Sequence, residues 1–271
     1  MEQLTHTCKS CGNQFTGLYC NLCGEKVILP KDRSFSTLMG SILVAITFAD
    51  NKSVKTMWSV LRNPGFVSGE FAEGRTVRYL KPMSLFFVLN LVYFLFPLIQ
   101  LFNATWVTQL GTVYGTLVLK LSLLKMNALH LPRNAFELMY NEKSVGYAKM
   151  LVIVFAVLAS LPLNLLYRKS TKFFSDHVGL MIELACFNLF ANALVVTLLA
   201  KLLPIGGYLN ETVLTVLFII TNMYFLVRSS ATFYGEQGWR LVAKSLVMLG
   251  FLKVALEAYR LVLFLVTIWS M

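Results

Sequence analysis

The sequence contains little charge for its length, and this scarcity excludes the most common class of protein. Charged residues make up 14% of the 271 residues, whereas hydrophobic residues make up 57%. Soluble globular domains carry about 25% charged residues. The composition therefore predicts an integral membrane protein. The net charge of +11 does not indicate nucleic acid, because Lys and Arg are spread along the chain and are densest before the first long apolar run. That distribution is expected at an anionic membrane face.

Signal-peptide, disulfide and catalytic patterns are also missing. The first thirty residues are polar, so we expect no secretory signal peptide. Four of the five cysteines lie in the opening segment and Cys186 lies in an apolar run, which argues against a disulfide framework and for a reducing compartment. The sequence shows no nucleophile elbow, HExxH pair or Walker loop. Asp176 and His177 form the only adjacent pair of an acid and an imidazole, so we expect no enzymatic activity.

The opening segment, CKSCGNQFTGLYCNLCGE, has the spacing of a metal site. Cys8 and Cys11 form one CxxC pair, Cys20 and Cys23 form another, and eight residues separate the pairs. Four thiolates at about 2.3 Å are typical ligands of structural Zn²⁺, and the glycine after each pair can take the positive φ that closes such a turn. We therefore predict a zinc ribbon in residues 1–30. A rubredoxin-like iron site and a redox dithiol remain alternatives. The ribbon serves either as a folding clip or as a docking module for a cytoplasmic partner.

Residues 31–82 are predicted to form basic amphipathic helices in the membrane interface. Residues 35–50 have the hydrophobic periodicity of a helix but are too short to cross a core of about 30 Å. Residues 51–62 form a second predicted helix, which Asn-Pro-Gly at positions 63–65 should end. Basic and aromatic residues before the first apolar run should anchor it at the headgroups or bind anionic lipid. These residues are Arg75, Arg78, Tyr79 and Lys81.

Residues 83–271 are predicted to form an all-α, polytopic transmembrane domain. Five apolar runs approach or exceed the length of about 20 residues that a bilayer requires. A further segment, residues 106–124, contains Gln, Thr, Gly and Lys and is predicted to be amphipathic or re-entrant. The positive-inside rule places the N-terminus and the basic loops near residues 168 and 228 in the cytoplasm. The five predicted spans are residues 83–102, 150–167, 178–200, 209–227 and 241–269.

Polar residues inside these spans are candidates for function, because ionisable groups in lipid are costly. In the last span, Lys253, Glu257 and Arg260 lie on one side of a helix. There they form either a self-neutralising stripe or a polar path for a solute, a proton or a lipid headgroup. Glu183 must either find a partner, for which Lys253 and Arg260 are candidates, or be protonated. Asn188 and Asn192 are expected to hydrogen-bond between helices. The complete candidate set is Asp176, His177, Glu183, Asn188, Asn192, Lys253, Glu257 and Arg260.

Several segments resemble a bacterial membrane family known as domain of unknown function 3667. They are the cysteine segment, LRNPGFVSGEFAEGRTVRYLKP, DHVGLMIELACFNLF and MYFLVRSSATFYGEQGWRLVAKSLV, in that order, and they extend over almost the whole chain. The acid-His pair of the family is matched by Asp176 and His177, and its Tyr-Gly pair by Tyr234 and Gly235, whereas Phe71 stands where Tyr is usual. The resemblance implies a zinc ribbon and an inner-membrane location, and it implies no activity.

These features lead to two main hypotheses of function. The first is a non-enzymatic scaffold or accessory subunit of a bacterial inner membrane, with its N-terminus in the cytoplasm. Its ribbon would bind a protein partner at the cytoplasmic face, or the chain would form a homo-oligomer, and its helices would contact membrane lipids but not nucleic acid. The alternative is a small transporter, channel or lipid-handling protein that uses the buried charges. A membrane enzyme is a third hypothesis.

Overall fold

A computed structural model describes most of the chain, apart from several short segments and one long one. The described residues are 5–8, 11–22, 24, 51–75, 78–96, 99, 101–202 and 211–271. The chain divides into two units, Met1–Asp50 and Asn51–Met271. The helix predicted at residues 35–50 lies outside the described residues, as does Cys23.

The first unit contains a short antiparallel hairpin. Strands β1 (Thr5–Thr7) and β2 (Gln14–Thr16) pair so that His6 lies opposite Phe15. Its described core consists of only three residues, Cys8, Phe15 and Cys20. So little apolar burial cannot offset the entropy of ordering the chain, and modules of this size therefore depend on a cross-link or a metal.

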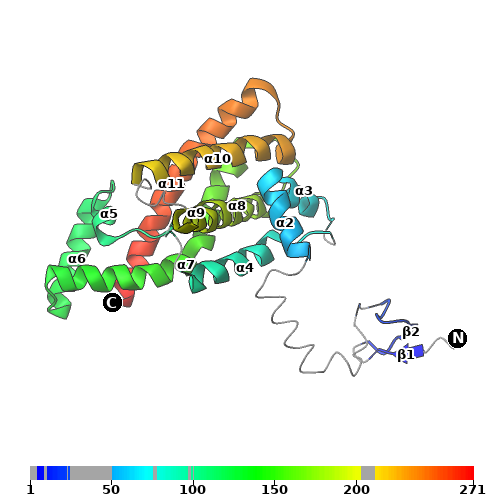
Figure 1. The fold of residues 1–271 in the computed structure, drawn as a ribbon, viewed down its shortest axis with the longest axis horizontal. Coiled ribbons are helices and arrows are strands. Elements are labelled where there is room, and N and C mark those ends of the chain that lie inside the picture. The colour runs from blue at the N-terminus through cyan, green and yellow to red at the C-terminus, as the bar shows by residue number, and fades with distance from the viewer. Residues whose placement is uncertain are drawn as a thin grey trace. The chain divides into compact units, whose positions relative to one another are not determined.

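In the second unit, every element of regular secondary structure among the described residues is a helix (Figure 1). The last turns of α8 pass directly into a π-helix, η2, and then into α9, so these three elements form one continuous helix. The elements are α2 (Asn51–Arg62), α3 (Phe66–Ala72), α4 (Pro82–Leu95), α5 (Trp106–Leu110), α6 (Gly115–Leu129), α7 (Arg133–Leu166), α8 (Phe174–Asn188), η2 (Leu189–Val195), α9 (Val196–Leu202), α10 (Glu211–Tyr234) and α11 (Gly238–Ser270).

Helix α8 lies at the centre of this unit (Figure 1). It contacts α2, α3, α4, α7 and α10, and every residue from 180 to 189 is buried. Helix α11 packs mainly along α7. A helix that is covered on all sides can hold polar residues only if they find partners inside the protein, and the continuous helix of α8 and η2 carries five of the candidate polar residues.

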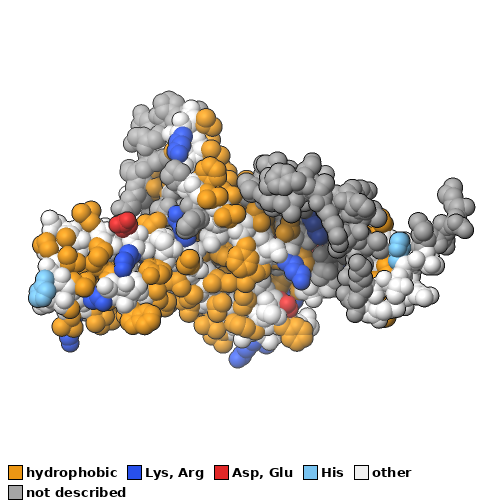
Figure 2. Space-filling model, turned by 90° about the horizontal axis from the view of Figure 1, so that it is seen from below, with side chains coloured by type: hydrophobic (Ala, Val, Ile, Leu, Met, Phe, Trp, Pro, Cys, Tyr) orange, Lys and Arg blue, Asp and Glu red, His pale blue; other side chains and the backbone are white. Residues whose placement is uncertain are grey.

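Among the described residues, three helices are long and apolar enough to cross a membrane: Arg133–Leu166, Phe174–Leu202 and Thr212–Tyr234. At about 1.5 Å per residue, each is longer than a hydrocarbon core of about 30 Å. Figure 2 shows hydrophobic side chains over much of the visible surface. Exposed examples are Leu165 on α7, Ile220 on α10 and Val254 on α11, each at least 60% exposed. A soluble monomer rarely exposes so much apolar surface, and the structure therefore supports a helical membrane protein.

The boundaries of the predicted spans differ from the helices in several places. Helix α4 ends at Leu95 and is too short for the span predicted at residues 83–102. Helix α7 begins at Arg133 rather than at residue 150. Residues 106–124 are not one element, because α5 ends at Leu110 and a turn precedes α6. Helix α11 matches the predicted span at 241–269 in length but is not among the three apolar helices.

Candidate functional site

Three of the four predicted metal ligands come together in the first unit. The Sγ atoms of Cys8, Cys11 and Cys20 lie within 4.8 Å of one another. The Sγ atoms of Cys11 and Cys20 are 3.6 Å apart. Two ligands on a tetrahedral ion with bonds of about 2.3 Å would be about 3.8 Å apart. These three cysteines could therefore hold a metal ion, while Cys23 lies outside the described residues.

Backbone hydrogen bonds around the cluster explain how the two CxxC segments come together. Strand β1 leads into Cys8, whose amide donates to the carbonyl of Asn13 (2.8 Å), so the first turn is closed by the hairpin itself. The amide of Gly12 donates to the Cys8 carbonyl (3.0 Å), and the amide of Gly24 donates to the Cys20 carbonyl (2.9 Å). Both glycines have positive φ, 73° and 76°. The prediction that the glycine after each CxxC pair takes a positive φ is confirmed.

Glu183 is the most deeply buried acid among the candidate residues, and it binds the start of α3. The residue is 1% exposed. Oε1 accepts from the Gly65 amide (2.8 Å), and Oε2 accepts from both the amide (2.8 Å) and the hydroxyl (2.5 Å) of Ser68. The suggestion that Lys253 or Arg260 would be its partner was wrong. A carboxylate can satisfy several donors at once, so backbone amides replace a cation here.

Gly65 makes this contact possible because it has no side chain. It ends the Asn-Pro-Gly stop after α2, where the chain turns with a φ of 81°. A Cβ atom at this position would lie 3.0 Å from Cα and Cβ of Ser229 on α10 and 3.2 Å from Cβ of Phe233. The turn that presents the Gly65 amide to Glu183 therefore also lies directly against α10. The predicted helix at residues 51–62 and its stop are both confirmed by α2.

We expect Gly65→Ala to lower the stability of the helical unit by about 2–5 kcal/mol, from backbone strain together with overpacking against α10. Thermal unfolding in one detergent would measure the effect. Gly74→Ala is the matched control, because Gly74 also has positive φ (82°) but a Cβ atom there would meet no atom of the described residues within 4 Å. It should lose only the strain component, about 1–2 kcal/mol. Equal losses in the two variants would mean that close packing on α10 is unimportant.

His177 belongs to a network that joins α7, α8 and α10. Its Nδ1 lies 2.7 Å from the hydroxyl of Tyr234, whose ring stacks on that of Tyr167 with centroids 3.6 Å apart. The neighbouring Asp176 instead accepts from the amide of Phe173 (2.9 Å) and caps α8. The acid-His and Tyr-Gly segments of the family resemblance thus meet in the fold, although 57 residues separate His177 from Tyr234.

The asparagines of α8 and η2 hydrogen-bond to α10, as the sequence predicted. Asn188 and Asn222 form a reciprocal pair in which each side-chain nitrogen donates to the other's oxygen (3.0 Å both ways). Asn192 donates to Thr221 (3.0 Å) and to Asn188 (2.7 Å). Buried amides that are satisfied in this way hold neighbouring helices in one register.

Three of the charged residues of α11, the candidates Lys253, Glu257 and Arg260, pair with one another. Lys253 Nζ lies 2.6 Å from Oε1 of Glu257, and Arg260 Nη1 lies 3.3 Å from the same oxygen. This confirms the local pairing that helix spacing predicts. The carbonyls of Glu257 and Arg260 also accept hydrogen bonds from Tyr114 and Gln109. Among the described residues, Oε2 of Glu257 and Nε of Arg260 are buried without a hydrogen-bond partner.

The basic residues before α4 have mixed environments. Arg75 pairs with Glu70 at 2.5 Å, and its hydrogen bond lowers the pKa of that carboxyl. Tyr79 is buried in the protein, whereas Arg78 and Lys81 are exposed. Arg75 therefore has an internal partner, and contact of these side chains with anionic lipid stays a prediction.

A buried cluster around α5 was not predicted from the sequence. Trp106 is 1% exposed, and its indole Nε1 donates to Ser122 Oγ (2.9 Å). Gln109 is fully buried and donates to the Arg260 carbonyl of α11 (3.0 Å). Gln109 contributed to the prediction that residues 106–124 form an amphipathic or re-entrant element, but in the structure it joins α5 to α11. No local pattern distinguishes these two cases.

The fold and these sites define a helical membrane protein with a cysteine cluster that could bind a metal. Residues 50–94 match the model of a family described as "Protein of unknown function (DUF3667)". This match supports the assignment of the chain to that family, which the resemblance in the sequence had predicted. It extends from the start of α2 into α4 and includes Gly65 and Ser68, the two residues that bind Glu183. No curated protein and no solved structure matches the chain.

Proposed function

We propose that this protein is a non-enzymatic scaffold or accessory subunit of a membrane complex. The supporting observation is that polar residues buried in the helical unit are paired inside the fold: Glu183 with α3, His177 with Tyr234, and Asn188 with Asn222. A conduction pathway needs polar groups that can exchange their partners for a passing ligand. Groups that are already satisfied instead determine how the helices pack.

We further propose that the metal is Zn²⁺, held by Cys8, Cys11, Cys20 and Cys23. Four thiolates without an open position for substrate are typical of structural zinc sites. Such a site stabilises a small surface module and carries out no reaction, which supports a role in binding a protein partner. An iron site of the rubredoxin type has the same ligands, and metal analysis distinguishes the two.

For the membrane arrangement, we propose five crossings in a bacterial inner membrane, with the N-terminus in the cytoplasm. The network of Tyr167, His177 and Tyr234 gathers the end of α7, the start of α8 and the end of α10. The basic connections that follow α7 and α10 therefore lie at one end of the unit, as the positive-inside rule requires. Helix α11 supplies one further crossing.

Helix α4 supplies the remaining crossing together with the segment that follows it. At about 1.5 Å per residue it spans about 21 Å, less than the hydrocarbon core. Phe102 and Ala104 in the following segment are buried, and the amide of Ile99 donates to Thr197 Oγ1 of α9 (3.1 Å). Irregular backbone is tolerated at membrane depth where protein covers it.

The scaffold proposal is tested by native mass spectrometry of the full-length protein extracted gently from its own membranes. We expect a partner chain or a second copy at fixed stoichiometry, and its loss when Cys8→Ser and Cys11→Ser are combined. Two controls should retain the complex: Cys186→Ser, which changes a cysteine outside the cluster, and Glu257→Gln, which changes the charged group of α11. A complex that survives the double cysteine variant would contradict the assignment of partner binding to the ribbon.

One observation favours the alternative of a transporter, channel or lipid-handling protein. Glu257 and Arg260 each keep a buried polar atom without a partner in the described part of the chain, and such atoms are available to a ligand. Under this alternative, protein reconstituted in liposomes would show a proton, ion or lipid flux that Glu257→Gln abolishes. A flux that is present and insensitive to the ribbon variants would favour it over the scaffold.

A further inference from the structure

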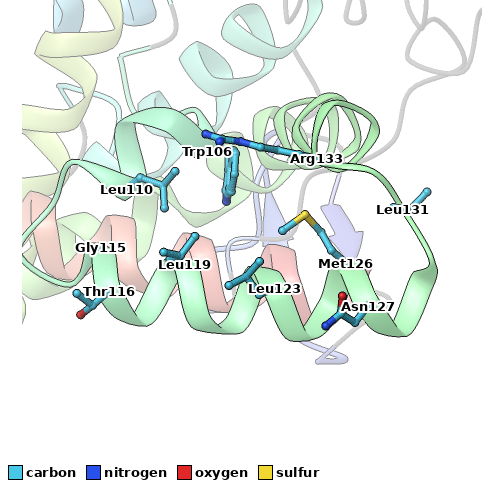
Figure 3. Close-up of a pocket in the computed structure, with 10 residues that line it drawn as sticks. All are labelled: Trp106, Leu110, Gly115, Thr116, Leu119, Leu123, Met126, Asn127, Leu131 and Arg133. Carbon is cyan, nitrogen blue, oxygen red and sulfur yellow. The ribbon is translucent and has the colours of Figure 1, made fainter.

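An apolar groove lies between α5, α6 and the start of α7 (Figure 3). Its volume is about 660 Å³, which is within the range of about 300–1,000 Å³ found for ligand sites. Leu119, Leu123 and Met126 of α6 point towards the ring of Trp106 across the groove (Figure 3). Trp106 is buried and its indole Nε1 donates to Ser122, so its ring forms the apolar floor of the groove. The exposed part of the lining comes from Leu119 and Leu123, which are 45% and 48% exposed.

Arg133 is the one cation among the described residues that line this apolar groove. The guanidinium of Arg133 lies over the ring of Trp106, 5.1 Å from its centroid, and the residue is exposed. Within the described residues, Arg133 forms no ion pair with an acidic side chain. Stacking on Trp106 holds the guanidinium in place and leaves its N–H donors directed to other acceptors. A planar guanidinium of this kind binds phosphate oxygens well.

The charge of the surrounding surface favours an anionic occupant. Helix α6 contains Lys120 and Lys125 and no Asp or Glu. A second copy of this chain would bring a like-charged surface against it, which disfavours a homodimer at this place. Leu117 and Leu124 on α6 are 41% and 59% exposed, and such side chains are compatible with lipid tails. An anionic amphiphile satisfies both the apolar lining and the cation.

We propose that this groove binds an anionic phospholipid from the surrounding bilayer. One acyl chain lies along Leu119, Leu123 and Met126, and the phosphate accepts hydrogen bonds from the guanidinium of Arg133. The site requires a membrane location but is independent of the scaffold proposal. It gives the α5 and α6 region, which lies outside the matched family segment, a lipid-binding role.

Native mass spectrometry of the full-length protein with added phosphatidylglycerol or phosphatidylcholine tests the proposal. We expect one retained phosphatidylglycerol, bound about tenfold more tightly than phosphatidylcholine, as one charge-assisted hydrogen-bonded contact would produce. Arg133→Gln should abolish this headgroup preference, and Leu123→Trp should reduce the binding of both lipids by filling the groove. Two matched controls lie outside the groove. Lys120→Gln removes one charge of the surrounding surface and should keep the headgroup preference, and Leu138→Trp should bind both lipids like the unchanged protein.

Three results would overturn the proposal. The first is equal retention of the two lipids by the unchanged protein, or a headgroup preference that Arg133→Gln leaves intact. The second is a headgroup preference that Lys120→Gln abolishes as completely as Arg133→Gln, because the effect would then follow total charge. The third is a homodimer that Leu123→Trp dissociates, since a second copy would then occupy the groove. Arg133→Gln changes an exposed side chain, so it tests the proposal even if Leu123→Trp does not fold.

Discussion

Cys20→Ser should remove the metal from the purified full-length protein and unfold the segment around the β1–β2 hairpin. The Sγ of Cys20 is one of three that lie within 4.8 Å of one another, and the described core of this unit is only three residues. Metal binding contributes about 10–16 kcal/mol to the folding of small zinc modules, far more than this hairpin can gain from burial. Plasma mass spectrometry measures metal per chain, and limited proteolysis reports whether residues 5–24 stay protected.

Cys186→Ser is the matched control for this experiment. It makes the same chemical change at a buried cysteine of α8, and the metal content should stay at that of the unchanged protein. The same measurement identifies the metal, because zinc and iron are quantified separately. Full metal content in Cys20→Ser, or none in the unchanged protein purified under reducing conditions, would contradict a metal centre built from these cysteines.

Glu183→Gln should lower the free energy of unfolding of the helical unit by about 2–4 kcal/mol. The two side chains have nearly the same shape, so the variant changes hydrogen bonding and charge but little else. A glutamine offers one oxygen acceptor and directs an NH₂ group at a donor, whereas Glu183 accepts from two amides and a hydroxyl. Each buried donor left unsatisfied costs about 1–3 kcal/mol. Thermal and denaturant unfolding in a single detergent would measure the loss.

Glu142→Gln on α7 is the control, because this carboxylate is exposed and its removal should change stability by at most about 0.5 kcal/mol. Ser68→Ala should have an intermediate effect, since it removes the hydroxyl but keeps both backbone donors. If Glu183→Gln is as stable as the unchanged protein, Glu183 does not act as a carboxylate that holds α3. The same result would return Glu183 to the candidate polar path.

The cysteine cluster, the ion pairs of α11 and the end of α2 all follow from the spacing of residues along the chain. The two CxxC pairs indicated the cysteine cluster, and the interval of three and four residues among Lys253, Glu257 and Arg260 indicated their pairing. Asn-Pro-Gly indicated the end of α2. In each case the interacting atoms are close because covalent geometry or one helical turn brings them together, so sequence patterns suffice.

The start of α7 shows where hydropathy alone was misleading. Residues 133–149 include several charged side chains, so an apolar-run criterion placed the helix start at residue 150. The structure shows a helical period in the same stretch, because buried residues recur every four positions at Phe136, Tyr140, Ser144 and Ala148. A helix period in mixed polar sequence is evidence for packing against protein, although it does not indicate a membrane span.

Contacts between distant segments were decided by the tertiary structure. Glu183 lies 118 residues from Gly65, and His177 meets Tyr234 because α8 and α10 pack side by side. The chain by itself determined that it is an apolar helical protein with a cysteine cluster, since composition and local spacing carry that information. Which buried polar groups satisfy one another depends on how the helices are arranged around α8, because each hydrogen bond requires two groups to lie within about 3 Å. Local sequence does not contain that arrangement.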